Sequence, residues 1–165
     1  MNNIMLTGEK QVGKSTIINK IIRTHPGHAY GFQTLPDKET KQFYIQSMNG
    51  EYSKAYICKR NGNDRFIGLI HAFNDQGVSI LKDCLKKSPD LIIMDELGIF
   101  ENDAYQFHKY VHQCLYSPIP VLGVLKGKSS LFLDSIRNRM DTEVHTVTIE
   151  NRNQVYKVVK NAMHN

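Results

Sequence analysis

The segment Gly8-Glu9-Lys10-Gln11-Val12-Gly13-Lys14-Ser15 joins two stretches of different periodicity. Before it, residues 4–7 form a short apolar run that is typical of a buried strand. After it, isoleucines recur with the spacing of one helix face, at Ile17, Ile18, Ile21 and Ile22. Glycine at both ends of the segment permits positive φ and a close approach of the backbone to a ligand. The segment therefore predicts a strand–loop–helix unit whose amides and helix N-terminus bind phosphate.

The spacing of this loop also matches the Gly-x-x-x-x-Gly-Lys-Ser/Thr pattern of nucleoside-triphosphate sites. In such a loop the Lys14 charge interacts with β- and γ-phosphate oxygens, and the Ser15 hydroxyl can coordinate Mg²⁺. We therefore predict ATP, GTP or a related nucleotide as the substrate, with Mg²⁺ as the cofactor. Lys14 is predicted to be catalytic, and the predicted nucleotide-binding residues in the loop are Gly8, Glu9, Lys10, Gln11, Val12, Gly13, Lys14, Ser15 and Thr16.

Two acidic residues follow a second apolar run. Residues 91–94 are Leu-Ile-Ile-Met, as in a buried parallel strand, and Asp95 and Glu96 come directly after them. Because ligands of open α/β sheets bind at the C-terminal ends of strands, both acids should face the phosphate loop. We predict that Asp95 and Ser15 hold the metal, and that Glu96 orients or deprotonates an attacking water. Glu101 either joins this site or is an acid in the first turn of the next helix.

Strand-like and helix-like segments alternate along most of the chain. The predicted parallel strands cover residues 91–94, 120–125 and 144–149, and the predicted helices cover residues 14–23, 76–87, 102–116, 129–139 and 151–163. Residues 42–48 and 54–59 alternate as strands around the hairpin signal Asn49-Gly50, and residues 65–70 could add a third antiparallel strand. We predict a three-layer α/β fold with a mostly parallel central sheet and an antiparallel hairpin insert, in one domain spanning residues 1–165.

Composition narrows the class of protein further. The 165 residues carry a net charge of +5 without a run of like charges, so a nucleic-acid partner is not favoured. Three cysteines without a Cys-x-x-Cys pair argue against a disulfide framework or a zinc site, and favour a reducing compartment. Because neither a signal pattern nor a long apolar run occurs, we expect a cytoplasmic protein without membrane attachment. The sequence predicts no particular protein partner.

Three further motifs accompany the phosphate loop. Gly31-Phe32-Gln33-Thr34 is similar to a Gly-Phe-x-Thr motif, residues 95–101 to Asp-Glu-Ile-Gly-x-Met-Glu, and Glu150-Asn151-Arg152 to Glu-Asn-Arg. In this order, over nearly the whole chain, they resemble the small P-loop nucleoside-triphosphatase family, which includes thermophile proteins and the cancer-related nucleoside-triphosphatase of animals. The resemblance implies a RecA-like fold and slow, Mg²⁺-dependent hydrolysis of several nucleoside triphosphates to diphosphate and phosphate.

The chain departs from that family at three charged positions. Lys10-Gln11 replaces Pro-Gly in the loop, Lys38 stands where the family has arginine, and Lys126-Gly127 replaces His-Arg after a later strand. The last two changes remove candidate cations for the transition state, so other charges must stabilise it. Arg152, at the start of the last helix, is predicted to contact the nucleotide, and the other candidate cations are Lys126, Lys128, Arg137 and Arg139, the two arginines lying on a predicted helix.

Several polar and aromatic side chains have two interpretations. His108 and His112 have the spacing of metal ligands on a helix, but ordinary surface histidines are favoured. Four aromatic residues in or near strands could stack on a base, although positions in the core are favoured: Tyr30, Phe32, Phe43 and Tyr44.

Two other functions use the same loop. A small-molecule kinase would transfer the phosphoryl group to another acceptor, but no arginine-rich lid segment is evident. A nucleotide-binding switch with negligible turnover is the third possibility, although no Asn-Lys-x-Asp guanine motif follows the Asp-x-x-Gly at residues 95–98.

Overall fold

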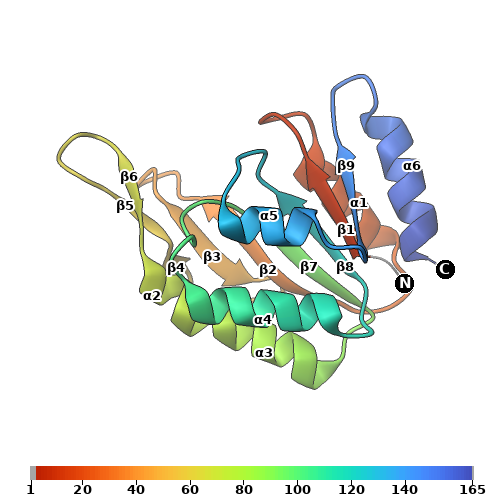
Figure 1. Cartoon of the computed structure of the whole chain (residues 1–165), viewed down its shortest axis with the longest axis horizontal. Coiled ribbons are helices and arrows are strands. Elements are labelled where there is room, and N and C mark those ends of the chain that lie inside the picture. The colour runs from red at the N-terminus through yellow and green to blue at the C-terminus, as the bar shows by residue number, and fades with distance from the viewer. Residues whose placement is uncertain (1–2, 165) are drawn as a thin grey trace.

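The computed structural model describes residues 3–164; residues 1, 2 and 165, which the predicted domain includes, lie outside the described part. Residues 3–164 form a seven-stranded sheet with the order β4-β3-β2-β7-β8-β1-β9, and a separate two-stranded sheet, β5-β6 (Figure 1). The strands are β1 (Asn3–Thr7), β2 (Ala29–Pro36), β3 (Phe43–Ser47), β4 (Ala55–Tyr56), β5 (Cys58–Arg60), β6 (Phe66–Gly68), β7 (Leu91–Leu97), β8 (Val121–Leu125) and β9 (Thr142–Thr146). From β2 to β9 the neighbours pair in parallel, whereas β3 and β4 are antiparallel. The predicted mostly parallel sheet is confirmed.

Helices cover both faces of this sheet. They are α1 (Lys14–Thr24), α2 (Ile70–Ala72), the π-helical turn η1 (Phe73–Gly77), α3 (Val78–Lys87), α4 (Tyr105–Tyr116), α5 (Leu131–Arg137) and α6 (Arg152–Met163). Helices α1 and α6 pack on one face, and α3, α4 and α5 pack on the other. Ile4 and Leu6 point to the first face and Met5 to the second, as the two-residue period of a strand requires. The predicted three layers are therefore present.

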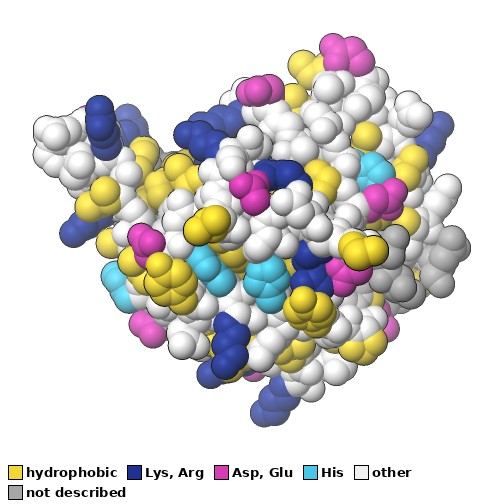
Figure 2. All heavy atoms as spheres, viewed as in Figure 1, with side chains coloured by type: hydrophobic (Ala, Val, Ile, Leu, Met, Phe, Trp, Pro, Cys, Tyr) yellow, Lys and Arg dark blue, Asp and Glu magenta, His cyan; other side chains and the backbone are white. Residues whose placement is uncertain are grey.

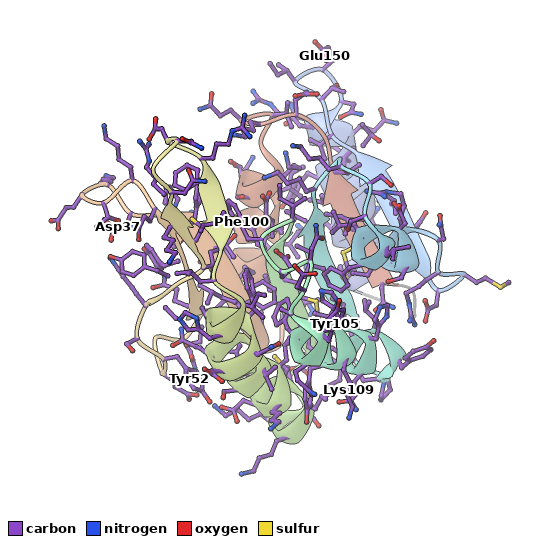
Figure 3. All side chains as sticks on the ribbon, turned by 60° about the vertical axis from the view of Figure 1, so that its left-hand side comes forward. Asp37, Tyr52, Phe100, Tyr105, Lys109 and Glu150 are labelled. Atoms are coloured by element: carbon purple, nitrogen blue, oxygen red, sulfur yellow. The ribbon has the colours of Figure 1, made fainter. Side chains whose placement is uncertain are left out.

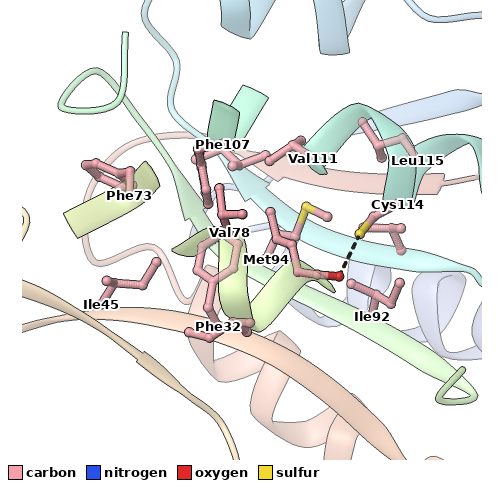
Figure 4. Packing of buried hydrophobic residues seen from close by; sticks show 14 of the residues in the cluster. Phe32, Ile45, Phe73, Val78, Ile92, Met94, Phe107, Val111, Cys114 and Leu115 are labelled. Carbon is pink, nitrogen blue, oxygen red and sulfur yellow. Dashed lines mark hydrogen bonds between the residues drawn. The ribbon is translucent and has the colours of Figure 1, made fainter. Parts of the chain in front are cut away.

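The larger core lies between the sheet and helices α3 and α4 (Figure 4). The Phe107 ring lies 5.2 Å from the Phe73 ring and 5.6 Å from the Phe32 ring, measured between centroids. The Cys114 thiol donates a hydrogen bond to the carbonyl oxygen of Leu81 at 3.8 Å. Truncation of a buried phenylalanine to alanine typically costs about 3–5 kcal/mol. This core fixes the position of β7, the strand that carries the two predicted site acids.

Three predicted elements prove shorter than expected. Helix α4 begins at Tyr105 rather than at residue 102, because residues 101–104 form a turn in which the Ala104 amide donates to the Glu101 carbonyl oxygen at 2.8 Å. Helix α5 covers residues 131–137 rather than 129–139, since the Ser130 side chain caps its start. Strand β9 covers residues 142–146 rather than 144–149, because its partner β1 ends at Thr7.

The antiparallel insert is divided differently from the prediction. Predicted strand 54–59 is interrupted at Ile57, whose amide donates to the Phe43 carbonyl oxygen and whose own carbonyl oxygen accepts from the Leu69 amide. Strand β4 before this point pairs with β3, whereas β5 after it pairs with β6 as the two-stranded sheet. The third strand of the insert therefore belongs to a separate hairpin, which projects from the body as an arm (Figure 1).

The turn at Asn49-Gly50 forms, but the strands do not meet there. Residues 48–54 separate β3 from β4, and the Tyr52 amide donates to the Ser47 hydroxyl at 3.1 Å. The helical segment after the insert begins at Ile70 instead of residue 76. Its π-helical turn presents the Gln76 amide group, which donates to the carbonyl oxygens of Ile45 and Ser53. These bonds join the helical segment to the insert. Sequence periodicity could not predict them, because they connect residues that are far apart in the sequence.

Candidate active site

The phosphate loop spans residues 8–13, between β1 and α1. Gly8 and Gly13 have φ values of 134° and 109°, and a Cβ at Gly8 would lie 2.4 Å from the Val147 carbonyl oxygen. Glycine is therefore required at Gly8 for conformation and for space. The first amides of α1 have no acceptor inside the helix, so its N-terminus presents positive partial charge to the space above the loop.

Four lysines surround the cleft at this loop. Its volume is about 460 Å³, and it is lined by Thr7, Gly8, Glu9, Lys10, Lys14, Glu96, Lys126, Gly127, Lys128 and Thr146. The Lys14 ammonium group donates to the carbonyl oxygens of Gly8 at 2.9 Å and Glu9 at 2.5 Å, which holds its charge against the loop. Such a concentration of positive charge attracts a polyanion such as a triphosphate.

Asp95 and Ser15 lie together in a neighbouring cleft that shares Glu96 with the phosphate cleft. The Ser15 hydroxyl donates to the Asp95 carboxylate, whose side chain is only 8% exposed. Burial raises the pKa of Asp95 to about 6; the Ser15 hydrogen bond and the Lys14 charge oppose this shift, and the Glu96 charge adds to it. A hydroxyl and a carboxylate are the hard oxygen donors that Mg²⁺ prefers, and a cation would compensate the buried charge. The two residues therefore fit a magnesium site.

Glu96 stands next to Asp95, on the exposed side of the strand. Its amide donates to the Thr34 hydroxyl at 3.1 Å, and its Oε1 lies 3.6 Å from the Lys126 Nζ. Both acids belong to β7, where the peptide bond between them is cis, so the strand extends beyond its predicted end at residue 94. The strand is longer because it keeps pairing with β2, where Gln33 is opposite Asp95.

Glu101 belongs to the interior and not to a helix start. Its side chain is 2% exposed, and its Oε1 accepts a hydrogen bond from the Gly98 amide at 2.5 Å. Burial raises the pKa of Glu101 to about 7, opposed by the bond from Gly98; Glu96 also raises it, and Lys126 lowers it. The alternative that this acid belongs to the first turn of the next helix is wrong, since α4 begins at Tyr105.

Arg152 lies beside Gly13, the last residue of the phosphate loop. A Cβ at Gly13 would lie 3.5 Å from the Arg152 Cδ. These two residues line a small cleft of about 220 Å³ together with Thr16, Ile17, Lys20, Asn153 and Tyr156. The structure thus brings the predicted contacts Thr16 and Arg152 together, beside Gly13 at the end of the loop where α1 begins.

The candidate cations separate into two groups. Lys126 and Lys128 line the phosphate cleft. Arg137 instead donates to the backbone carbonyl oxygens of Lys126 at 3.1 Å and Lys128 at 3.2 Å, and pairs with Asp134. Arg139 lies after α5 and not on it, and it binds Asp141 at 2.6 Å. Arg137 therefore supports the loop that carries the two lysines, and Arg139 has a structural partner.

The favoured core positions hold for three of the four strand aromatics, and the two histidines are half-buried. His108 stacks on Phe132 at 3.7 Å between ring centroids, and the His112 Nε2 lies 2.9 Å from the Ser135 hydroxyl. Within residues 3–164, no three histidine, cysteine or acidic side chains are grouped to hold a metal ion. Of the strand aromatics, Tyr30, Phe32 and Tyr44 are buried in the core, whereas Phe43 is partly exposed. Lys38 is exposed in the turn after β2.

Sequence reasoning missed an apolar cleft beside the carboxylates. It has a volume of about 420 Å³, and Asp95, Glu96 and Glu101 form its polar side. Its apolar side comes from separate parts of the chain, namely Phe43, Ile57, Phe66, Ile99 and Phe100. These positions share no motif or period, so no sequence signal could have brought them together before the insert was folded.

Fold and site together define an α/β protein of the P-loop nucleoside-triphosphate-binding class. A sequence model of the family described as NTPase matches residues 3–160, and the chain belongs to that family. It is 29% identical to the nucleoside-triphosphatase THEP1 of Natranaerobius thermophilus over 93% of this chain and 92% of that protein. It is 26% identical to the human cancer-related nucleoside-triphosphatase over 93% of this chain and 92% of that protein.

Two solved structures share the fold. The crystal structure of THEP1 from Aquifex aeolicus superposes with a TM-score of 0.81 at 23% identity, with 100% of both chains covered. The solution structure of a human cancer-related nucleoside triphosphatase gives a TM-score of 0.74 at 22% identity, covering 98% of this chain and 97% of that one. Within residues 3–164, no helix has the length and apolar character that a membrane crossing demands.

Proposed function

We propose that the protein hydrolyses nucleoside triphosphates, including ATP and GTP, to diphosphate and phosphate in a Mg²⁺-dependent reaction. Relatives that match nearly the whole chain carry the name nucleoside-triphosphatase. The observation that carries the proposal is the grouping of Ser15, Asp95 and Glu96 beside a cleft that contains four lysines. A metal-binding pair, a general base and a concentration of positive charge are what hydrolysis of a phosphoanhydride requires.

Each of these residues has a proposed role. The backbone of residues 8–13 and the first turn of α1 would bind the phosphates, with Lys14 against the β- and γ-phosphate oxygens. Ser15 and Asp95 would hold Mg²⁺, which when bound neutralises phosphate charge and orients the leaving group. Arg152 would contact the nucleotide, because its cleft adjoins Gly13 at the end of the loop and is separate from the cleft that contains the four lysines.

The chemical step assigns the proton to Glu96. The oxygen of a water molecule forms a bond to the γ-phosphorus while the bond from this phosphorus to the β–γ bridging oxygen breaks. The water proton passes to the Glu96 carboxylate, and the bridging oxygen leaves with the diphosphate. Lys126 lies 3.6 Å from Glu96 and is therefore close enough to stabilise negative charge that develops on the transferred group.

The thiols support a reducing compartment, which we propose is the cytoplasm. Cys58, Cys84 and Cys114 are all free and buried. Disulfides form and persist in oxidising compartments, so a chain of this kind is stable where thiols stay reduced. For Cys84 and Cys114 burial raises the thiol pKa, which favours the unreactive protonated form.

Phosphate release from ATP, GTP, CTP and UTP tests the proposal. Wild type is compared with Lys14→Ala and Glu96→Gln, and the matched controls are Lys109→Ala and Glu39→Gln, two exposed positions away from the clefts. We expect both site variants to lose at least about 100-fold in turnover, while both controls keep it. Omission of Mg²⁺ should have the same effect as the site substitutions.

Nucleotide affinity distinguishes the two roles. Glu96→Gln should still bind the nucleotide, because its carboxylate acts on the attacking water, whereas Lys14→Ala should bind it more weakly. Wild type that binds ATP with Mg²⁺ but releases no phosphate above the buffer rate would refute hydrolysis. Turnover that survives Glu96→Gln would remove Glu96 from the general-base role.

A further inference from the structure

The apolar cleft beside Glu96 is too large for its only occupant to be the attacking water. Its volume is about 420 Å³, whereas one water molecule occupies about 30 Å³. Small-molecule sites have volumes of about 300–1,000 Å³, with mostly apolar and aromatic walls and a few polar groups. This cleft matches that description, because rings and aliphatic side chains form one side and carboxylates form the other.

Three phenylalanines from different elements build the apolar wall. Phe43 lies in β3, Phe66 in β6, and Phe100 in the loop that follows the site strand β7. Their ring centroids are 6.0 to 6.3 Å apart, with one tilted and two edge-on contacts. Figure 3 shows Phe100 between the β5–β6 arm and the main sheet. In Figure 2, hydrophobic side chains gather in the notch where the arm joins the body.

The wall is held closely against the site strand. A Cβ at Gly68, at the end of β6, would lie 2.2 Å from the Phe100 carbonyl oxygen, so the arm packs directly on the loop after β7. The Leu69 amide donates to the Ile57 carbonyl oxygen at 2.8 Å, which fixes the base of the arm. The cleft is therefore built into the fold and does not depend on the exposed tip of the hairpin.

Glu96 connects this cleft with the phosphate cleft. It lines both, and so does Lys10. A hydroxyl group placed at the polar end of the apolar cleft would thus meet the same carboxylate that faces the phosphates. The Thr34 hydroxyl and the buried Glu101 carboxyl also line this end, and they provide hydrogen-bonding partners for a polar group.

The charges of the cleft indicate a neutral occupant. Glu96 and Glu101 face it together with two lysines, Lys10 and Lys126, whereas the charge of Asp95 would be taken up by the proposed Mg²⁺. Both lysines also line the phosphate cleft, so they would share their charge with the bound triphosphate. A second anion at the acidic end would be repelled by the carboxylates and by the γ-phosphate.

We propose that the apolar cleft binds a neutral alcohol with an aromatic or otherwise apolar body, and that the protein transfers the γ-phosphoryl group to its hydroxyl. This inference rests on the proposed nucleotide site. The alcohol oxygen forms a bond to the γ-phosphorus, and its proton passes to the Glu96 carboxylate. The bond from the γ-phosphorus to the β–γ bridging oxygen breaks, so the products are a phosphate monoester and a nucleoside diphosphate. Hydrolysis is then the same reaction with water in place of the alcohol.

A tryptophan reporter tests binding in the cleft. The chain contains no tryptophan, so Phe100→Trp and Phe66→Trp each give a single fluorophore at the wall, and Tyr116→Trp gives an exposed control. The probes are adenosine, thymidine and 2-phenylethanol, added in the presence of MgADP. We expect a saturable change in emission for at least one wall variant and none for the control. Equal changes in wall and control variants, or none in either wall variant, would overturn the binding claim.

Product analysis with γ-³²P-labelled ATP tests transfer to the same probes. We expect label in a phosphate monoester of a probe, and the ratio of transferred to released phosphate should fall about tenfold in Phe66→Ala. The ratio should be unchanged in Tyr116→Trp. Adenosine should be a better acceptor than AMP, because AMP brings a second anion to the acidic end.

The outcomes separate this inference from the hydrolase proposal. Released phosphate without labelled monoester would refute transfer and leave hydrolysis standing. Labelled monoester without released phosphate would support transfer and refute hydrolysis. Label on AMP but not on adenosine would refute the neutral acceptor, and probes that only accelerate phosphate release would show an activator site instead of an acceptor site.

Discussion

Replacement of Asp95 by asparagine should stabilise the nucleotide-free, metal-free protein at neutral pH. The Asp95 side chain is 8% exposed, and burial raises its pKa to about 6 from a model-compound value of 3.8. Its ionised form is therefore less stable in the folded chain than in the unfolded chain. Asparagine has nearly the same shape and can still accept the Ser15 hydrogen bond, but it carries no charge to bury.

The size and the pH window of the effect follow from the two pKa values. A shift of about 2.2 units, from 3.8 to about 6, corresponds to about 3 kcal/mol at 1.36 kcal/mol per unit. Because the folded state binds the proton more tightly, wild-type stability from this group falls as pH rises from about 4 to about 6, and is constant above. For a domain of 165 residues, about 3 kcal/mol corresponds to about 6–12 °C in Tm.

Thermal unfolding of wild type and Asp95→Asn from pH 4 to pH 8, with EDTA present, measures this difference. The variant should melt about 6–12 °C higher at pH 8, with the advantage disappearing toward pH 4. Asp103→Asn, at an exposed position, should follow wild type throughout. When MgADP replaces the EDTA, the Tm of wild type should rise more than that of Asp95→Asn, since the variant lacks the metal ligand. An Asp95→Asn variant that is less stable than wild type at pH 8 without metal would refute the reasoning.

Three further substitutions have defined outcomes. Gly31→Ala should lower the free energy of unfolding in urea by about 3 kcal/mol or more, because Gly31 has φ 148° and a Cβ would lie 2.0 Å from the Ile93 carbonyl oxygen; a neutral effect would contradict the β2–β7 geometry. Lys126→Met should reduce kcat for phosphate release about 100-fold with little change in nucleotide Kd, if it stabilises the transition state; an equal loss in both would assign it to ground-state binding. Glu101→Gln should raise Tm at pH 8 but not at pH 4, because burial raises the pKa of Glu101 to about 7 and the ionised carboxylate destabilises the folded state above that pH. A variant that melts higher than wild type at pH 4 only would contradict this direction of the pKa shift.

The parallel part of the fold was predictable because local signals agree with the tertiary structure. Residues 91–94 are apolar throughout, and a strand buried on both faces needs that composition. The end of β9 was not predictable, since β1 ends at the phosphate loop and pairing stops there, whatever the propensity of residues 147–149. The split of residues 54–59 at Ile57 also depends on distant partners, Phe43 on one side and Leu69 on the other.

The candidate site shows the same division. The phosphate loop, Asp95 and Glu96 could be found in sequence because each lies in a short contiguous motif with a physical reason for its spacing. Arg137 could not be interpreted correctly, because its partners are backbone carbonyl oxygens of Lys126 and Lys128. A sequence reports that a charge is present but not what it contacts after folding.

That contact of Arg137 suggests how the chain compensates for the arginine it lacks at the site. An arginine in the phosphate cleft would bind phosphate oxygens through a rigid fork, whereas lysine offers a mobile point charge. Here Arg137 donates hydrogen bonds to the backbone carbonyl oxygens of Lys126 and Lys128. These bonds fix the backbone of the two lysines, while their side chains remain mobile. Lys126 also lies 3.6 Å from Glu96, and its ammonium group has three donors. In the proposed reaction, the Lys126 ammonium group can therefore stay close to the Glu96 carboxylate while it donates another hydrogen bond to the transferred phosphoryl group. The γ-phosphate would in this way help to position Glu96, the general base.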